Sequence, residues 1–274
     1  MTQNEADPCL HFGAQTDLNT CVTRHLFLLC PNNSGSTFLS KALGTSPDVW
    51  HLPREGQHAL GFSGPITQHE NGLIWASTQT SLDQISNPKA FNWHQNKKAW
   101  YFQARAHSTD AKVFFTKAPP FLAYADLLKQ HFSSTRFLIM VRNPYAMIEA
   151  ILRRRGQFIK DLDVLLPIAV RHTIACLEMQ RANQSKFTGI STFFTYEEMC
   201  RTPDLVEQKI KKLVPEIKTL QLNQRLSVKQ QYNERLRDMN AQQIDRLAPQ
   251  QISHISQMLE PHTSLLSHFG YELL

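Results

Sequence analysis

The sequence predicts an α/β fold: a P-loop-like parallel β-sheet flanked by helices, with a helical C-terminal part. Short apolar runs at 26–30, 113–116, 137–141 and 190–195 alternate with segments of helical periodicity, an order typical of βαβ units. The first of these runs leads through a tight turn directly into a helix. Because 42% of the 274 residues are hydrophobic, the chain can bury a sizeable core, and we expect one domain spanning 1–274.

The first half of the chain is predicted to hold one strand, turn and helix unit and a variable insertion. Residues 1–23 are expected to form an irregular lead-in. The buried strand at 26–30 is followed by a helix that begins at Ser36 or Thr37. Residues 56–110 are rich in small and polar side chains with scattered aromatic ones, and their periodicity is weak. Such a segment is typical of an insertion that carries specificity.

The second half of the chain continues the alternation and then becomes helical. Between the second and third strands we expect a helix at 123–131. The third strand is followed by a helix with Pro144 in its first turn, a favourable place for proline. Residues 161–184 are predicted to form a further helix. After the fourth strand the chain is expected to be mostly amphipathic helix, including the Gln-, Lys- and Arg-rich stretch 210–250.

The charge of the chain indicates an anionic partner. The formal charge is +6 and the isoelectric point is about 9.1. Basic residues are scattered, and the densest runs, at 153–155 and 211–212, are too short for a nucleic-acid-binding stripe. We therefore expect a compact anion site and no nucleic acid partner.

The cysteines and the N-terminus bear on redox state and location. Five cysteines stand at irregular spacings without a CxxC pair, so neither a disulfide framework nor a metal site is predicted. The N-terminal segment is polar and acidic, and no run approaches the ~18 apolar residues of a membrane span. We expect a soluble, cytoplasmic protein without a membrane span.

The stretch LFLLCPNNSGSTFLSKAL is the first motif that carries chemistry. It puts Gly35 among small polar residues, between a buried strand and the start of a helix, where backbone N–H groups converge on an anion. Ser34, Ser36 and Thr37 add hydroxyl groups. The same residues are also ordinary helix-start chemistry, so an N-cap without a ligand is the alternative. A Walker A loop is excluded because Ser36, and not lysine, follows Gly35.

The stretch RFLIMVRNPYAMIEAILRRR supplies a second anion site. Arg142 follows a buried strand, and ligands bind at the carboxyl ends of strands in parallel sheets. On the next helix, two alanines precede Arg154 at four-residue spacing, so Arg154 shares one face with small side chains and can join Arg142. Arg153 and Arg155 are expected at the surface, with Arg153 paired to Glu149.

Four motifs in this order resemble the sulfotransferase family, closest in style to the tyrosylprotein type and its bacterial relatives. The resemblance spans about 24–274 and is weakest at 60–110. It is carried by PNNSGST, FFTKAPPFLAYADLLKQHFSSTRFLIMVRNP, TFFTYEEMCRTPDLVEQKIKKLVPEI and ISQMLEPHTSLLSHFGYELL. It implies transfer of a sulfonate group from 3′-phosphoadenosine 5′-phosphosulfate (PAPS) to an acceptor hydroxyl, without a metal.

The resemblance implies a role for each matched residue in donor binding. The turn that contains Asn33 and Ser34 would hold the 5′-phosphosulfate, and Arg142 and Arg154 would bind the 3′-phosphate. A serine or lysine from the 225–230 stretch closes the donor site in relatives. The remaining donor-site residues by this resemblance are Gly35, Ser36, Thr37, Tyr196 beside the adenine, Ser227 and Lys229.

The resemblance also assigns the catalytic groups. Lys117 matches the family lysine that reaches the sulfonate, where it offsets developing negative charge. Glu55 is the predicted general base, and His51 is the second choice because some sulfotransferases use histidine. The alternative for Lys117 and Glu55 is a surface charge. The acceptor, a small-molecule, carbohydrate or peptide hydroxyl, and the oligomeric state stay open.

The sequence departs from the family pattern at two positions, which keeps other functions open. Asn33 stands where the family has Lys or Arg, and an amide cannot neutralise charge. Ala150 stands where the family usually has serine. A donor-binding protein that has lost catalysis is therefore one alternative. A P-loop kinase is another, disfavoured by the missing Walker lysine.

Overall fold

The computed structural model of the chain describes residues 10–67, 72–228 and 232–274. Its centre is a seven-stranded sheet in the order β1-β4-β3-β5-β2-β6-β7, and all pairs from β3 to β7 are parallel. The strands are β1 (His11–Phe12), β2 (Arg24–Leu29), β3 (Val49–His51), β4 (Arg105–Ala106), β5 (Val113–Lys117), β6 (Thr135–Val141) and β7 (Ser191–Thr195). The predicted α/β class and all four predicted strands are confirmed.

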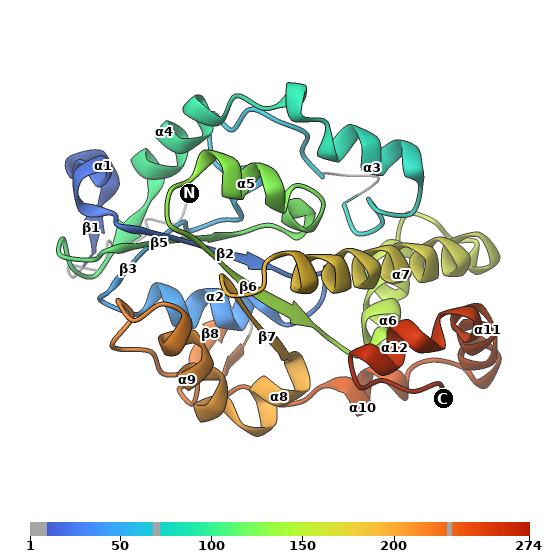
Figure 1. Cartoon of the computed structure of the whole chain (residues 1–274). Coiled ribbons are helices and arrows are strands. Elements are labelled where there is room, and N and C mark those ends of the chain that lie inside the picture. Colours follow the sequence, from blue (N-terminus) through green and yellow to red (C-terminus); the bar gives the residue numbers. More distant parts are fainter. Residues whose placement is uncertain (1–9, 68–71, 229–231) are drawn as a thin grey trace.

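Helices cover both faces of this sheet (Figure 1). Alternate residues of β2 show why: Leu26 and Leu28 pack on one face, and Phe27 and Leu29 on the other. The helices are α1 (Leu18–Cys21), α2 (Ser36–Gly44), α3 (Gln79–Ser86), α4 (Trp93–Gln103), α5 (Ala125–His131), α6 (Pro144–Arg155), α7 (Leu162–Lys186), α8 (Tyr196–Arg201), α9 (Pro203–Leu213), α10 (Asn240–Ile244), α11 (Pro249–Leu259) and α12 (Thr263–His268).

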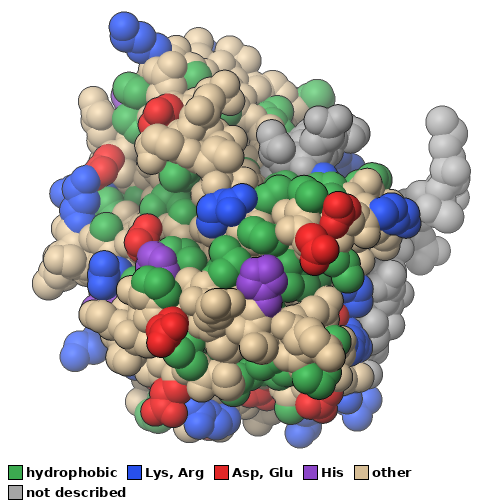
Figure 2. Space-filling view, turned by 90° about the vertical axis from the view of Figure 1, so that its right-hand side faces the viewer, with side chains coloured by type: hydrophobic (Ala, Val, Ile, Leu, Met, Phe, Trp, Pro, Cys, Tyr) green, Lys and Arg blue, Asp and Glu red, His purple; other side chains and the backbone are tan. Residues whose placement is uncertain are grey.

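Three buried clusters hold the layers together. Aromatic side chains of α4 and aliphatic side chains of α5 pack with α7 on the face that carries Phe27. Helices α2, α8 and α9 pack on the opposite face. The third cluster joins α6 and α7 to α11 and α12, so the predicted helical C-terminal part packs beside the sheet. On the side of the molecule seen in Figure 2, Lys and Arg side chains stand singly among acidic, polar and apolar ones, and they form no continuous basic stripe on that face.

Two predicted segments are built differently from expectation. The lead-in is not irregular throughout, because β1 pairs antiparallel with β4 and α1 follows it. The 210–250 stretch is not a continuous helix: after α9 it contains a hairpin of β8 (Leu226–Val228) and β9 (Tyr232–Glu234), then the short α10. Its polar composition fits an exposed helix and an exposed hairpin equally well, so composition alone misassigned it.

The insertion at 56–110 is more ordered than its weak periodicity suggests. It supplies α3, α4 and β4, and its aromatic side chains are mostly core: Trp75 and Trp100 are fully buried. The indole N–H of Trp100 donates to the carbonyl of Gly56 at 2.8 Å. A Cβ at Gly56 would lie 2.9 Å from the ring of Phe121, so glycine is required where this backbone meets the aromatic wall. The insertion thus fixes the segment that leads out of β3.

Candidate functional site

The predicted site residues follow different strands but meet at one edge of the sheet. Glu55 lies just beyond β3, Lys117 ends β5, Arg142 follows β6 and Tyr196 follows β7. Because these strands are parallel, their carboxyl ends lie together. In Figure 1 the arrowheads of β2 and β6 point to the side where α6 and α10 lie. A cleft of about 1530 Å³ opens there.

This cleft brings together most of the predicted residues. Its lining also includes side chains of α6 and the segment around α10. The predicted residues that line it are Asn33, Gly35, Ser36, Thr37, Glu55, Lys117, Arg142, Arg154 and Tyr196. The cleft is therefore the candidate active site.

The turn between β2 and α2 has the backbone of an anion cradle. Asn33 and Gly35 both adopt left-handed conformations, with φ of 61° and 82°. A Cβ on Gly35 would lie 2.5 Å from the ring of Tyr196, so only glycine lets the turn approach that ring. Ser34 is fully buried and donates its hydroxyl to the carbonyl of Pro31 at 2.8 Å, so this side chain shapes the turn and does not face the cleft. The residues with hydroxyl groups that this turn and the start of α2 bring to the cleft wall are Ser36 and Thr37.

Arg142 is held in place by the protein on every side. Its Nη1 donates to the carbonyl of Asn33 and its Nε to Oδ1 of Asn240, at 2.9 and 2.8 Å, and Nη2 donates to Gln243. The guanidinium lies over the ring of Tyr196, 4.1 Å from its centroid, in a cation–π contact. The side chain is buried and pre-organised for an anion.

Tyr196 links β7 to the segment before α10. Its hydroxyl donates to the carbonyl of Arg237 at 2.7 Å and accepts from the N–H of Met239 at 3.2 Å. These bonds hold the chain that brings Asn240 and Gln243 to Arg142. The ring is only 3% exposed, because Arg142 lies over it and the turn at Gly35 packs against it, so Tyr196 chiefly fixes the position of the guanidinium at the cleft.

The three arginines at the end of α6 have different surroundings. Arg153 pairs with Glu149 at 2.8 Å, as predicted from their spacing. Arg154 donates from Nη1 to Oδ1 of Asn33 at 2.9 Å. Arg155 was expected at the surface, but it is buried, with its guanidinium over the ring of Phe158. The chain turns after α6, and this turn brings Phe158 over Arg155. Helical spacing alone does not predict that Arg155 is buried.

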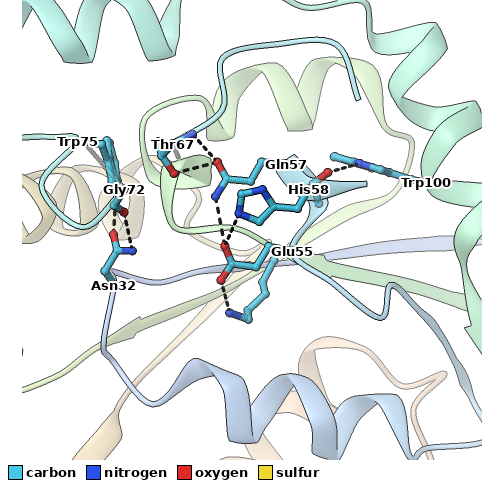
Figure 3. A network of polar contacts seen from close by, with 10 residues as sticks. Asn32, Glu55, Gln57, His58, Thr67, Gly72, Trp75 and Trp100 are labelled. Atoms are coloured by element: carbon cyan, nitrogen blue, oxygen red, sulfur yellow. Dashed lines mark hydrogen bonds and ion pairs between the residues drawn. The ribbon is translucent and has the colours of Figure 1, made fainter. Parts of the chain in front are cut away.

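Glu55 and Lys117 form an ion pair inside the cleft (Figure 3). Lys117 is only 8% exposed, and its Nζ lies 2.8 Å from Oε1 of Glu55. Burial alone would raise the pKa of Glu55, but the charge and hydrogen bond of Lys117, with a further bond from Gln57, lower this pKa below its usual value. Burial likewise opposes the charged form of Lys117, yet the Glu55 charge raises the pKa of this lysine. Both groups are therefore charged at neutral pH.

Gln57 orients the second oxygen of Glu55. Its Nε2 donates to Oε2 of Glu55 at 3.2 Å, and its own oxygen accepts from the N–H and hydroxyl of Thr67 at 3.0 and 2.9 Å. The amide is buried and all its bonds run within the protein. His58 lies 3.9 Å from the same carboxylate oxygen. Figure 3 shows His58 and Gln57 on the same side of Glu55. Both oxygens of the carboxylate are thus held by neighbouring side chains, and Glu55 lines the cleft.

The turn between β2 and α2 is tied to the insertion through Asn32. This side chain accepts from the indole N–H of Trp75 at 2.8 Å and donates to the carbonyl of Gly72 at 3.2 Å (Figure 3). The insertion therefore contacts the turn through Trp75 and Gly72, and it contacts Glu55 through its own Gln57. Its described residues fix the spacing between the turn and Glu55.

Besides Ser34, three predicted residues lie elsewhere or outside the described part of the chain. His51 is not among the described residues that line the cleft; it packs beside Gly44, and burial, with the nearby charges of His107 and Arg105, lowers its pKa to about 4. Ser227 lies in β8, and its side chain is outside the described part, as is the whole of Lys229.

Sequence reasoning missed several residues that build the site. They are amide side chains from segments without a motif: Gln57, Asn240 and Gln243. Only Gln57 carried a signal, since it stands two residues after Glu55. Among the described residues no cluster of three or more His, Cys, Asp or Glu has the arrangement of a metal site. No described helix is long and apolar enough to cross a membrane.

The chain is similar to known sulfotransferases. The sequence model of the sulfotransferase family matches residues 25–214. A sulfotransferase structure from Alicyclobacillus acidocaldarius superposes with a TM-score of 0.54 at 14% identity, covering 91% of this chain and 97% of that one. The sulfotransferase domain from the curacin biosynthetic pathway gives 0.54 at 16% identity, covering 91% and 98%.

A mouse sulfotransferase complexed with PAP gives a TM-score of 0.50 at 11% identity, covering 90% of this chain and 89% of that one. No curated protein sequence gives a significant match. At these identities the solved structures establish a shared fold.

Replacing Lys117 tests the electrostatics of the ion pair. We expect Lys117→Met to raise the pKa of Glu55 above its value in the parent protein, because the lysine charge and hydrogen bond are what offset the burial of this carboxylate. The pKa is measured by carboxyl ¹³C NMR titration, with Glu55→Gln to assign the signal. Lys186→Met, which breaks the exposed pair with Asp126, is the control and leaves Glu55 unchanged. An unshifted Glu55 in Lys117→Met would contradict the pairing.

Proposed function

The chain belongs to the sulfotransferase family, since the family model matches more than half of it, and from this premise we propose that it transfers the sulfonate group of PAPS to an acceptor hydroxyl. We further propose that it acts as a single domain. The observation that carries the proposal is the convergence of the anion cradle, Arg142 and the Glu55–Lys117 pair in one cleft. One fold relative, the mouse enzyme, is complexed with PAP, the desulfonated donor.

In this proposal the donor lies along the cleft from the turn to Tyr196. The left-handed turn at Asn33 and Gly35 offers backbone N–H groups to the 5′-phosphosulfate, with Ser36 and Thr37 adding hydroxyl donors. Arg142 binds the 3′-phosphate, and Tyr196 flanks the adenine. The cation–π contact between these two residues supports this placement, because it fixes the charge beside the aromatic wall.

The reaction then needs a base and a positive charge at the sulfur. Glu55 accepts the acceptor's hydroxyl proton while that oxygen bonds to sulfur, and the bond from sulfur to the 5′-phosphate oxygen breaks, leaving adenosine 3′,5′-bisphosphate. Lys117 offsets negative charge on the transferring group. Once Lys117 turns to the sulfonate, Glu55 loses part of the interaction that lowers its pKa and becomes a stronger base.

The bisphosphate product gives the simplest test of the donor site. We expect adenosine 3′,5′-bisphosphate to bind with a micromolar or lower dissociation constant in isothermal calorimetry without added metal, because backbone amides and arginines supply the charge. Mg-ATP should bind far more weakly. Binding of Mg-ATP in preference to the bisphosphate would favour the kinase alternative, and no binding of the bisphosphate would end the sulfotransferase proposal.

The role of Glu55 is tested by its isosteric amide. Glu55→Gln should lower the rate of sulfonate transfer from PAPS by about 10²- to 10⁴-fold, the usual contribution of a positioned base. Bisphosphate affinity should stay within about twofold, since Glu55 lies on the reacting side of the cleft. The assay follows bisphosphate release with a panel of phenols, sugars and tyrosine peptides.

The matched control is Glu178→Gln, an exposed glutamate of α7. Full activity of Glu55→Gln would refute the assignment of the base. Tight bisphosphate binding with no transfer to any acceptor by the parent protein would instead favour a donor-binding protein without catalysis.

A further inference from the structure

The turn that cradles the donor phosphate carries no positive side chain of its own. Residues 31–37 read Pro, Asn, Asn, Ser, Gly, Ser and Thr. Backbone N–H groups provide only partial charges, whereas a phosphosulfate brings full negative charge into a partly desolvated cleft. The compensating charge must come from a neighbouring element.

Among the described residues, Arg142 and Arg154 donate hydrogen bonds to this turn, and both bonds are to Asn33. Arg142 donates to the main-chain oxygen of Asn33 and Arg154 donates to its side-chain oxygen, each at 2.9 Å. The left-handed backbone of Asn33, with φ of 61°, is a conformation that asparagine tolerates well. It lets the main-chain and side-chain oxygens each serve a different arginine.

The two arginines differ in their other partners. Arg142 lies over the ring of Tyr196 and is bonded to Asn240 and Gln243, so it belongs to the part of the cleft formed by Tyr196 and α10. Arg154 is hydrogen-bonded to the side chain of the turn itself, and it lines the same cleft as Glu55.

We propose that Arg154, held by Asn33, supplies the positive charge of the phosphate turn and contacts the 5′-phosphosulfate rather than the 3′-phosphate. This inference rests on the proposed donor. Arg154 stabilises the negative charge that develops on the 5′-phosphate oxygen as the sulfur–oxygen bond breaks. The side chain of Asn33 acts as the positioning group, because its oxygen fixes the guanidinium at the turn.

Nucleotides with a single phosphate separate the two assignments without any knowledge of the acceptor. Dissociation constants of 5′-AMP, 3′-AMP and adenosine 3′,5′-bisphosphate are measured by NMR titration, which also covers weak binding. We expect Arg154→Gln to weaken 5′-AMP and the bisphosphate about tenfold or more, the effect of losing one charge-assisted hydrogen bond. Binding of 3′-AMP should stay within about twofold. Arg154→Lys keeps the charge and should recover part of the loss.

The matched control is Arg171→Gln, an exposed arginine of α7, which should bind all three nucleotides as the parent does. Weaker 3′-AMP binding with unchanged 5′-AMP binding in Arg154→Gln would return Arg154 to the 3′-phosphate and overturn the inference. Unchanged binding of all three, or an Arg154→Lys variant as weak as Arg154→Gln, would overturn it as well. Failure of the parent protein to bind the bisphosphate is a different result, which rejects the proposed function itself.

Discussion

Parallel pairing of β2 with β5 and β6 is the constraint on which the site depends. It puts the carboxyl ends of these strands at one edge, so the turn at Gly35, Lys117 and Arg142 meet although they are far apart in the sequence. The same edge receives Glu55 from β3 and Tyr196 from β7. No single motif forms the cleft. Each motif contributes one wall, because the sheet brings the ends of its strands together.

The cationic side chains Lys117 and Arg142 have partners within the protein. Lys117 is paired with Glu55, and Arg142 is surrounded by the oxygens of Asn33, Asn240 and Gln243. These partners offset the cost of holding charges in a partly dry site. An incoming anion therefore competes with partners inside the protein, which are neutral amides at Arg142 and a carboxylate at Lys117. We propose that a phosphate readily replaces the amides at Arg142, whereas Lys117 leaves Glu55 only for the reacting group.

The sequence predicted the parts of the fold and site that local patterns encode. Strand β2, the turn at Gly35 and the proline start of α6 each follow from apolar runs, glycine and helix-start residues. The sequence did not predict which distant residues are hydrogen-bonded to one another. The contact of Asn240 with Arg142 spans 98 positions, and the bond of Asn32 with Trp75 spans 43, so neither leaves a local trace. The hairpin β8–β9 was missed because a polar composition suits a helix as well as a strand.

We propose that one cleft binds the donor along its length, with the reacting end at Glu55 and Lys117. A crystal structure with adenosine 3′,5′-bisphosphate tests this most directly. It should place the 5′-phosphate against the turn at Gly35 and Thr37, the 3′-phosphate on Arg142, and Lys117 within hydrogen-bond reach of the 5′-phosphate oxygens. A nucleotide bound elsewhere, or bound in the cleft with the 5′-phosphate remote from Glu55 and Lys117, would contradict it.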